Sequence, residues 1–311
     1  MSSVSTTSTA SAANKLTGGG VSGVHPAVRR RRRRTAAVKW SLITVALAFL
    51  FALLFVPLVA VFVQAFDRGI GVYLAALRHP DAISSIVLTL LTALFVVPIN
   101  VAFGVAAAWA VARFQFRGRQ LVITLIDLPF AVSPVISGLI FVLLFGAQGL
   151  LGPWLEQHDI RIIFALPGIV LATMFVTVPF VARELIPVLQ EQGAEDEEAA
   201  LTLGASGWQM FRRVTLPNVK WALMYGVILL TARTVGEFGA VSVVSGHVRG
   251  QTNTIPLHVE ILYNEYDFTA AFAVASVLTI IALLSLVGRQ VIDWRAGESA
   301  AGGRAHRGLP L

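Results

Sequence analysis

Ionisable residues within apolar stretches are the first candidates for chemistry in this chain. Arg233 and Glu237 lie four residues apart in the apolar segment 219–245, so a helix would place both side chains on one face. A lone charge at bilayer depth costs roughly 2.5–3.5 kcal/mol on insertion scales. The forked donors of arginine suit a tetrahedral oxyanion. The pair therefore either lines a translocation path or forms a structural ion pair, whereas a structural role is expected for Asp127.

Polar residues elsewhere do not form a recognisable catalytic or metal-binding set. The segment 247–267 contains His258, Glu260, Glu265 and Asp267, but no two histidines have the i, i+4 spacing of metal ligands. The chain has no cysteine and no GxxxxGK[ST], HExxH or GxSxG motif. We therefore expect no catalytic residue and no metal or cofactor bound by this chain. We expect 247–267 to be a solvated loop that meets an external partner.

The longest polar interruption in the interior of the chain covers residues 191–217 and is called the polar segment below. Four acidic residues, 195–198, begin a run of helix formers, and clustered carboxylates favour the first turn of a helix. Gly204 follows, and glycine readily adopts the positive φ that ends a helix. Ser206 and Gln209 have capping-box spacing at the start of a second helix. The polar segment therefore predicts two short helices joined by a glycine, as in a docking element.

Composition indicates an all-α membrane protein. The 311 residues are 56% hydrophobic and only 13% charged, whereas soluble domains carry about 25% charged residues. Apolar runs of about twenty residues are long enough to cross a bilayer. Six spans are predicted, at 40–66, 82–112, 120–146, 162–182, 219–245 and 269–292. Prolines lie only in the first four spans, which should be kinked, whereas the last two should be straighter.

Charge distribution orients these spans. With both termini on one side, nineteen of the 24 basic residues fall on that side and four on the other, so both termini and the polar segment are expected in the cytoplasm. Residues 1–38 are rich in Ser, Thr and Ala and are expected to be a disordered tail. Its arginines, 29–34, should contact anionic lipid, not nucleic acid. Residues 39–294 are expected to form a six-span membrane domain, and 295–311 are expected to form a second cytoplasmic tail.

The spacing within the polar segment resembles the EAA loop of ABC importer permeases. The family pattern is EAA, three residues, G, nine residues and then I-x-L-P. Here it is matched by Glu198, Ala199, Ala200, Gly204, Val214, Leu216 and Pro217, with valine in place of isoleucine. Four stretches narrow the resemblance to sulfate/thiosulfate permeases of the CysW type: DLPFAVSPV (127–135), PFVARELIPV (179–188), GASGWQMFRRVTLPN (204–218) and GEFGAVSVVSG (236–246).

This resemblance implies the six-helix, MetI-like fold of type I importers in the bacterial inner membrane. It also implies three partners: two copies of an ATPase subunit that binds ATP and Mg, a second homologous permease subunit, and a periplasmic sulfate/thiosulfate-binding protein. The EAA-loop residues would form a coupling helix that docks on the ATPase. Molybdate, tungstate or phosphate remain alternative substrates, and a self-sufficient secondary carrier is the alternative class.

Overall fold

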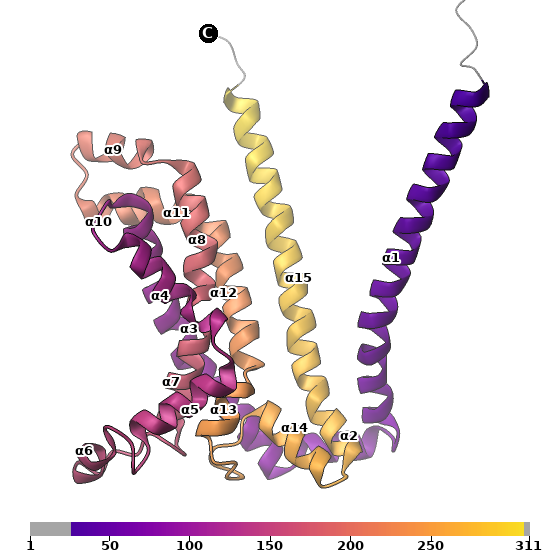
Figure 1. Cartoon of the computed structure of the whole chain (residues 1–311), viewed down its shortest axis with the longest axis vertical. Coiled ribbons are helices and arrows are strands. Elements are labelled where there is room, and N and C mark those ends of the chain that lie inside the picture. Colours follow the sequence, from indigo (N-terminus) through magenta and orange to yellow (C-terminus); the bar gives the residue numbers. More distant parts are fainter. Residues whose placement is uncertain (1–25, 308–311) are drawn as a thin grey trace, which may run out of the picture. The chain divides into compact units, whose positions relative to one another are not determined.

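The computed structural model describes residues 26–307, which are helical in most of their length and contain no strand (Figure 1). The chain divides into two units, residues 1–57 and 58–311, and each is described by itself. The helices are α1 Pro26–Phe66, α2 Ile70–Arg78, α3 Pro80–Arg113, α4 Arg119–Ala131, α5 Pro134–Phe145, α6 Gly152–Gln157, α7 Leu166–Thr177, α8 Pro179–Gln192, α9 Glu195–Thr202, α10 Gly207–Met210, the π-helix η1 Phe211–Thr215, α11 Leu216–Asn218, α12 Lys220–Val235, α13 Gly239–Val244, α14 Ile255–Asn264 and α15 Phe268–Arg307.

Four helices are long and apolar enough to cross a membrane: Val38–Phe66, Pro80–Arg113, Leu166–Gln192 and Phe268–Ile292. Two bent helix pairs raise the number to six if each pair is one span. One pair is α4 with α5, which meet at 106°, so the kink expected in the span 120–146 is present as a sharp break. The break lies at Ser133, which has ψ 136° because the residue before a proline is pushed out of the helical region.

The fifth predicted span, 219–245, is also broken, although it contains no proline. Helix α12 ends at Val235 and α13 begins at Gly239. The expectation that the last two spans are the straighter ones is therefore wrong for this span. Phe238 has φ −121° and ψ −53°, which is outside helical geometry, and Glu237 satisfies a backbone donor of α13 in place of a helical carbonyl.

The N-terminal tail expected over 1–38 is helical in its described part. Residues 1–25 and 308–311 lie outside the described residues. From Pro26 to residue 38 the chain is part of α1, and α15 continues to Arg307, so both stretches are helical. Alanine and arginine are among the best helix formers, which favours continuing each apolar helix beyond its span.

Close helix approach organises the core of residues 58–311. Helix α3 packs along α8, where a Cβ on Gly104 would come within 2.7 Å of the Cβ of Val181. Helix α5 packs against α13, where a Cβ on Gly138 would come within 2.6 Å of the carbonyl oxygen of Ala240. Interiors are packed to crystal-like density, so neither contact could accommodate a larger residue without separating the helices. Helix α12 packs against α3, α8 and α15, and α13 packs against α5 and α7.

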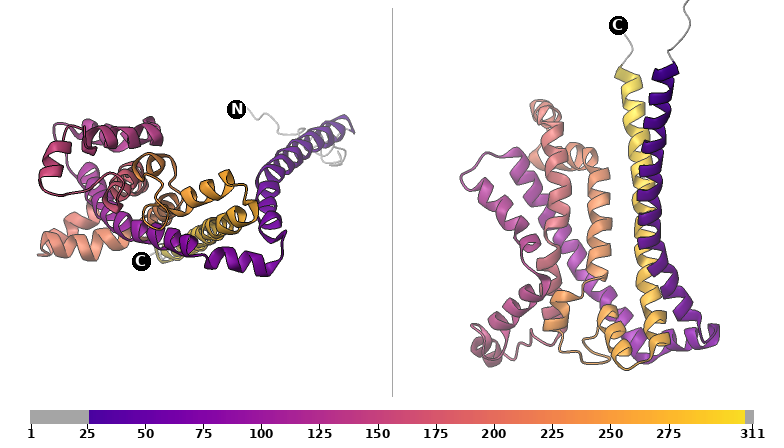
Figure 2. Two further views of the ribbon diagram at one scale, coloured as in Figure 1. Left: turned by 90° about the horizontal axis from the view of Figure 1, so that it is seen from below. Right: turned by 45° about the vertical axis from the view of Figure 1, so that its right-hand side comes forward.

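The short helices gather at two opposite ends of this unit. Helices α9, α10 and α11 lie together beside the end of α8, whereas α6 and α14 lie at the other end (Figure 1). The right-hand view of Figure 2 shows the same separation. The polar segment is thus on the side of the unit opposite the segment 247–267.

Candidate functional site

The polar segment folds as two helical pieces joined by a glycine, as its sequence predicts. Helix α9 is Glu195–Thr202 and has all four acidic residues in its first turn. Gly204 follows with φ +88°, and Ala205 donates its N–H to the carbonyl of Ala200 at 3.0 Å. The capping box is complete: the Ser206 hydroxyl accepts from the N–H of Gln209, and the Gln209 side chain accepts from the N–H of Ser206.

A buried ion pair fixes the polar segment to the spans. Arg113, the last residue of α3, donates from Nε to Glu197 Oε2 at 2.8 Å and from Nη1 to the carbonyl of Leu189 at 2.6 Å. The other carboxylate oxygen of Glu197 accepts from the Thr215 hydroxyl at 2.8 Å. Only 9% of each charged side chain is exposed. The carboxylate of Glu197 therefore joins α9 to α3 and η1. The second hydrogen bond of Arg113, to Leu189, joins α3 to α8.

Sequence reasoning missed Glu197 and singled out its neighbour. Glu198 and Glu197 are both acidic residues in the first turn of α9, but Glu198 is exposed and Glu197 is buried. The sequence did indicate that the two side chains differ, because adjacent residues of a helix are rotated by about 100° and so point to different faces. The identity of the buried face depends on Arg113, which is 84 residues away.

The predicted docking residues lie on the outer surface of the polar segment. Glu198, Ala199, Gly204 and Pro217 are exposed, and the other three are half-buried. Ala200, Gly204 and Val214 line a shallow hollow of about 380 Å³. Leu203 stands beside it with 89% of its surface exposed. Two small residues and an uncovered leucine around a hollow are suited to receiving a protuberance or helix of another protein.

The structure joins the two charged residues of the fifth span. Arg233 Nη1 lies 2.5 Å from Glu237 Oε2, and Glu237 Oε1 accepts from the N–H of Ala240 at 2.9 Å. The side chain of Glu237 is 1% exposed, whereas that of Arg233 is 33% exposed. Glu237 therefore holds the break between α12 and α13, while the side chain of Arg233 stays partly exposed. Asp127 lies 3.2 Å from Arg183 of α8 in an exposed ion pair, and its structural role stays a prediction.

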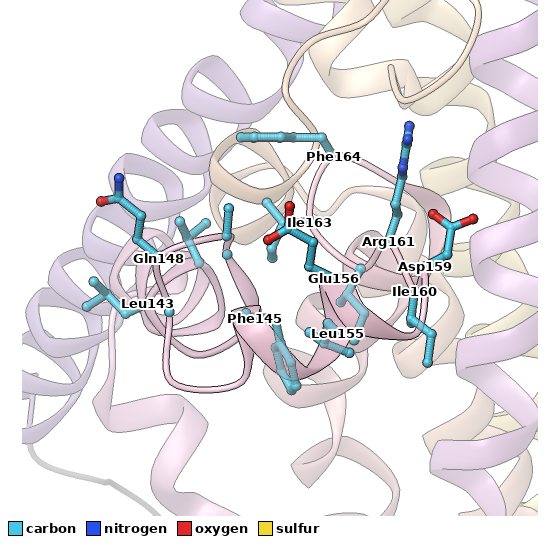
Figure 3. A pocket seen from close by; sticks show the side chains of 16 residues that line it. Leu143, Phe145, Gln148, Leu155, Glu156, Asp159, Ile160, Arg161, Ile163 and Phe164 are labelled. Carbon is cyan, nitrogen blue, oxygen red and sulfur yellow. The ribbon is translucent and has the colours of Figure 1, made fainter.

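At the opposite end, α5, α6 and the following loop surround a hollow of about 820 Å³. Figure 3 shows Glu156, Asp159 and Arg161 among its lining side chains, together with Phe164. Phe164 has φ +60°, and its N–H donates to the carbonyl of Val244 at 2.9 Å. This hydrogen bond holds the rim of the hollow to the end of α13.

The solvated loop expected over 247–267 is largely wrong, because α14 occupies its second half. His258 is 3% exposed, and Thr252, Asn253 and Thr254 are also buried. The N–H of Ile255 donates to the Thr89 hydroxyl of α3 at 2.9 Å. Burial lowers the pKa of His258 below its usual value, and the nearby carboxylate of Asp81 opposes this effect. Packing against α3 and α15 converts the second half of this segment into a structural element.

In the described part of the chain, no three His, Asp or Glu residues form a cluster that could hold a metal ion. His247 lies 3.5 Å from Glu260, and Arg249 forms an ion pair with Glu265. These pairs link the residues before α14 to α14 and the turn that follows it.

Comparison with known proteins identifies relatives over most of the chain. Residues 100–295 match the family described as "Binding-protein-dependent transport system inner membrane component". The sulfate transport system permease protein CysW of Escherichia coli K12 is 51% identical over 257 residues, which is 83% of this chain and 88% of that protein. The permease protein CysT of the same system and strain is 37% identical and covers 83% and 93%.

A solved structure shares the fold. It is the bacterial alginate ABC transporter in complex with an alginate pentasaccharide-bound periplasmic protein. One of its chains matches with a TM-score of 0.69 at 15% identity, over 84% of this chain and 94% of that chain.

Proposed function

The chain belongs to the family of inner membrane components of binding-protein-dependent transport systems, and on this premise we propose that it carries sulfate and thiosulfate. It is a permease subunit of an ABC importer. The choice of anion is supported by the 51% identity to a sulfate permease over most of both chains. Molybdate, tungstate and phosphate are the competing oxyanions.

The observation that carries the mechanism is the exposed surface of the polar segment, rigidly attached by Glu197. We propose that a partner ATPase pair docks on Glu198, Ala200 and Gly204 and binds ATP and Mg itself. When ATP binding favours closure of the pair, the docked segment moves with it, and the ion pair with Arg113 passes the movement to α3 and α8. This chain then contributes one half of a pathway whose other half is a second, homologous permease.

The partner for the opposite end is a substrate-binding protein in the periplasm. Its proposed contact is the face formed by α6, α14 and the hollow shown in Figure 3. The mixed charges of Glu156, Asp159 and Arg161 suit a polar protein surface that docks and leaves in each cycle. A route between the two ends passes the fifth span, where we propose that Arg233, oriented by Glu237, faces the anion.

The orientation is tested by labelling, because the chain has no native cysteine. We propose that both termini and the polar segment lie in the cytoplasm of the bacterial cell. A single cysteine replacing Ser206 should react with a membrane-impermeant maleimide only after the membrane is opened, whereas one replacing Gln251 should react from outside. The reverse pattern would refute this orientation.

The function is tested by reconstituting the chain in vesicles with the candidate ATPase, second permease and binding protein. We expect sulfate-loaded binding protein to stimulate ATP hydrolysis and sulfate uptake. Stimulation by molybdate instead would reassign the substrate but keep the class. Uptake by this chain alone, without ATP, would favour a secondary carrier and contradict the proposal.

A further inference from the structure

An apolar groove of about 610 Å³ lies between the end of α3 and the second half of the polar segment. Ten residues line it, and Gly207 is the only one that is neither aliphatic nor aromatic. They include Val101, Val105 and Trp109 of α3, Phe211 and Leu216 of the polar segment, and Leu223 of α12. The residues from Val101 to Trp109 cover about 12 Å along the helix axis, at 1.5 Å per residue.

A second hollow, of about 310 Å³, adjoins this groove and is basic. It is lined by Trp208, Gln209, Arg212 and Arg213, and Trp208 lines both hollows. Both arginines are exposed, and neither forms an ion pair with any residue that the structure describes. Trp208 stacks on Phe211 at 5.8 Å between ring centroids, so one aromatic wall continues from the apolar groove to its arginine rim.

The groove lies where a membrane-spanning helix approaches the bilayer surface. Trp109 precedes the end of the spanning helix α3 at Arg113 by one turn. Tryptophan concentrates at the membrane–water interface because its ring is apolar and its N–H is polar. Each arginine just beyond that level strengthens the binding of anionic headgroups by about fivefold. Along the membrane normal, the apolar groove therefore lies at the depth of a lipid acyl chain, and the arginine rim lies at the depth of the lipid phosphate.

We propose that the apolar groove and its arginine rim bind one anionic phospholipid. An acyl chain lies between α3 and Phe211, and the phosphate accepts hydrogen bonds from Arg212 and Arg213. A peptide strand would leave its backbone unsatisfied in a groove with almost no polar atoms. The arginine run 29–34 of another copy would be repelled by the rim. The bound lipid fills the gap between α3 and the polar segment and so supports the position of that segment.

The test measures tryptophan quenching by brominated lipids in vesicles that contain the full chain. Dibromo-phosphatidylglycerol and dibromo-phosphatidylcholine are compared at equal mole fraction, and the signal of the Trp208→Phe variant is subtracted. We expect stronger quenching by the anionic lipid. Replacing Arg212 and Arg213 with glutamine should lower that preference by about fivefold per arginine. Arg161→Gln, at the opposite end of the unit, is the matched control and should leave it unchanged.

A second variant separates the groove from its charges. Val105→Phe fills the apolar groove from α3 and leaves both arginines in place, so it should reduce quenching of Trp208 by the anionic lipid. Equal quenching by the two lipids, or a preference that survives loss of both arginines, would overturn the proposal. Quenching that disappears when the second permease is added would also overturn it, because the groove would then be a subunit interface.

Discussion

Replacing Glu197 with alanine should detach the polar segment from the spans while leaving its own two helices formed. The substitution removes the acceptor of Arg113 Nε and of the Thr215 hydroxyl, and these are the contacts through which α9 is held to α3 and η1. Both charged side chains are 9% exposed, so water cannot readily replace the lost carboxylate. Among the described residues, Arg113 would keep only the carbonyl of Leu189 as a partner.

The size of the effect follows from this burial. Removing one partner of a buried ion pair typically costs about 3–5 kcal/mol, because the other charge is left uncompensated. That energy corresponds to a change of roughly 150- to 5,000-fold in the equilibrium between attached and detached segment. Glu195→Ala is the matched control, since Glu195 is exposed in the same turn of α9. Exposed charges of this kind contribute about 0–1 kcal/mol.

Two measurements report on this detachment. Hydrogen exchange of the backbone amides of 195–218 should accelerate in Glu197→Ala and stay near wild type in Glu195→Ala. In the reconstituted importer, the number of ATP molecules hydrolysed per anion transported should rise, because the docked segment would move without α3. A double variant, Arg113→Gln with Glu197→Gln, should lose less than the sum of the two single variants if the two side chains act as a pair.

The reasoning would be refuted by equal hydrogen exchange in Glu197→Ala and Glu195→Ala. Full additivity in the double variant would equally show that the two side chains do not interact. Faster hydrogen exchange in Glu197→Ala with an unchanged number of ATP molecules per anion would show that Glu197 attaches the polar segment but has no role in coupling.

Three further predictions concern other parts of the chain. The Gly204→Asp variant should insert normally but lose ATP-driven uptake. The φ of +88° at Gly204 strains any side chain, and the docked ATPase would cover this position. The control variant Gly207→Ala should retain uptake. Gly138→Val should lower the thermal unfolding temperature in detergent, because even a Cβ there meets the backbone of α13 at 2.6 Å, and Gly71→Ala, with open space, should not. His258 has a lowered pKa, so the stability that it contributes is complete above about pH 6.5 and declines as the pH falls below that value. Unfolding temperatures measured from pH 8 to pH 5 should therefore fall more for the wild type than for His258→Gln.

Local chemistry explains why the polar segment could be read directly from the sequence. The acidic first turn of α9, the positive φ of Gly204 and the capping box of Ser206 with Gln209 all depend on residues within four positions of one another. The i, i+4 pair of Arg233 and Glu237 is equally local, and the structure contains it. Their roles in docking and transport stay predictions, because only the assembled importer can test them.

The missed features depend on contacts between distant parts of the chain. Burial of Glu197 requires Arg113, and burial of His258 requires the packing of α14 on α3 and α15. The break after α12 carries no proline signal, and it is stabilised because Glu237 satisfies the N–H of Ala240 in the next helix. A polar segment of mixed composition, such as 247–267, does not reveal by itself whether other helices will cover it.

The sequence by itself determined the all-α membrane class, the approximate positions of the spans and the two helices of the polar segment. These properties follow from hydrophobicity and from hydrogen bonds within a few residues, which every helix must satisfy locally. The tertiary structure alone decided which acidic residue of α9 is an anchor and which ones face a partner. It also decided where spans break, because helix packing selects the buried face and supplies partners for backbone groups that a broken helix leaves free.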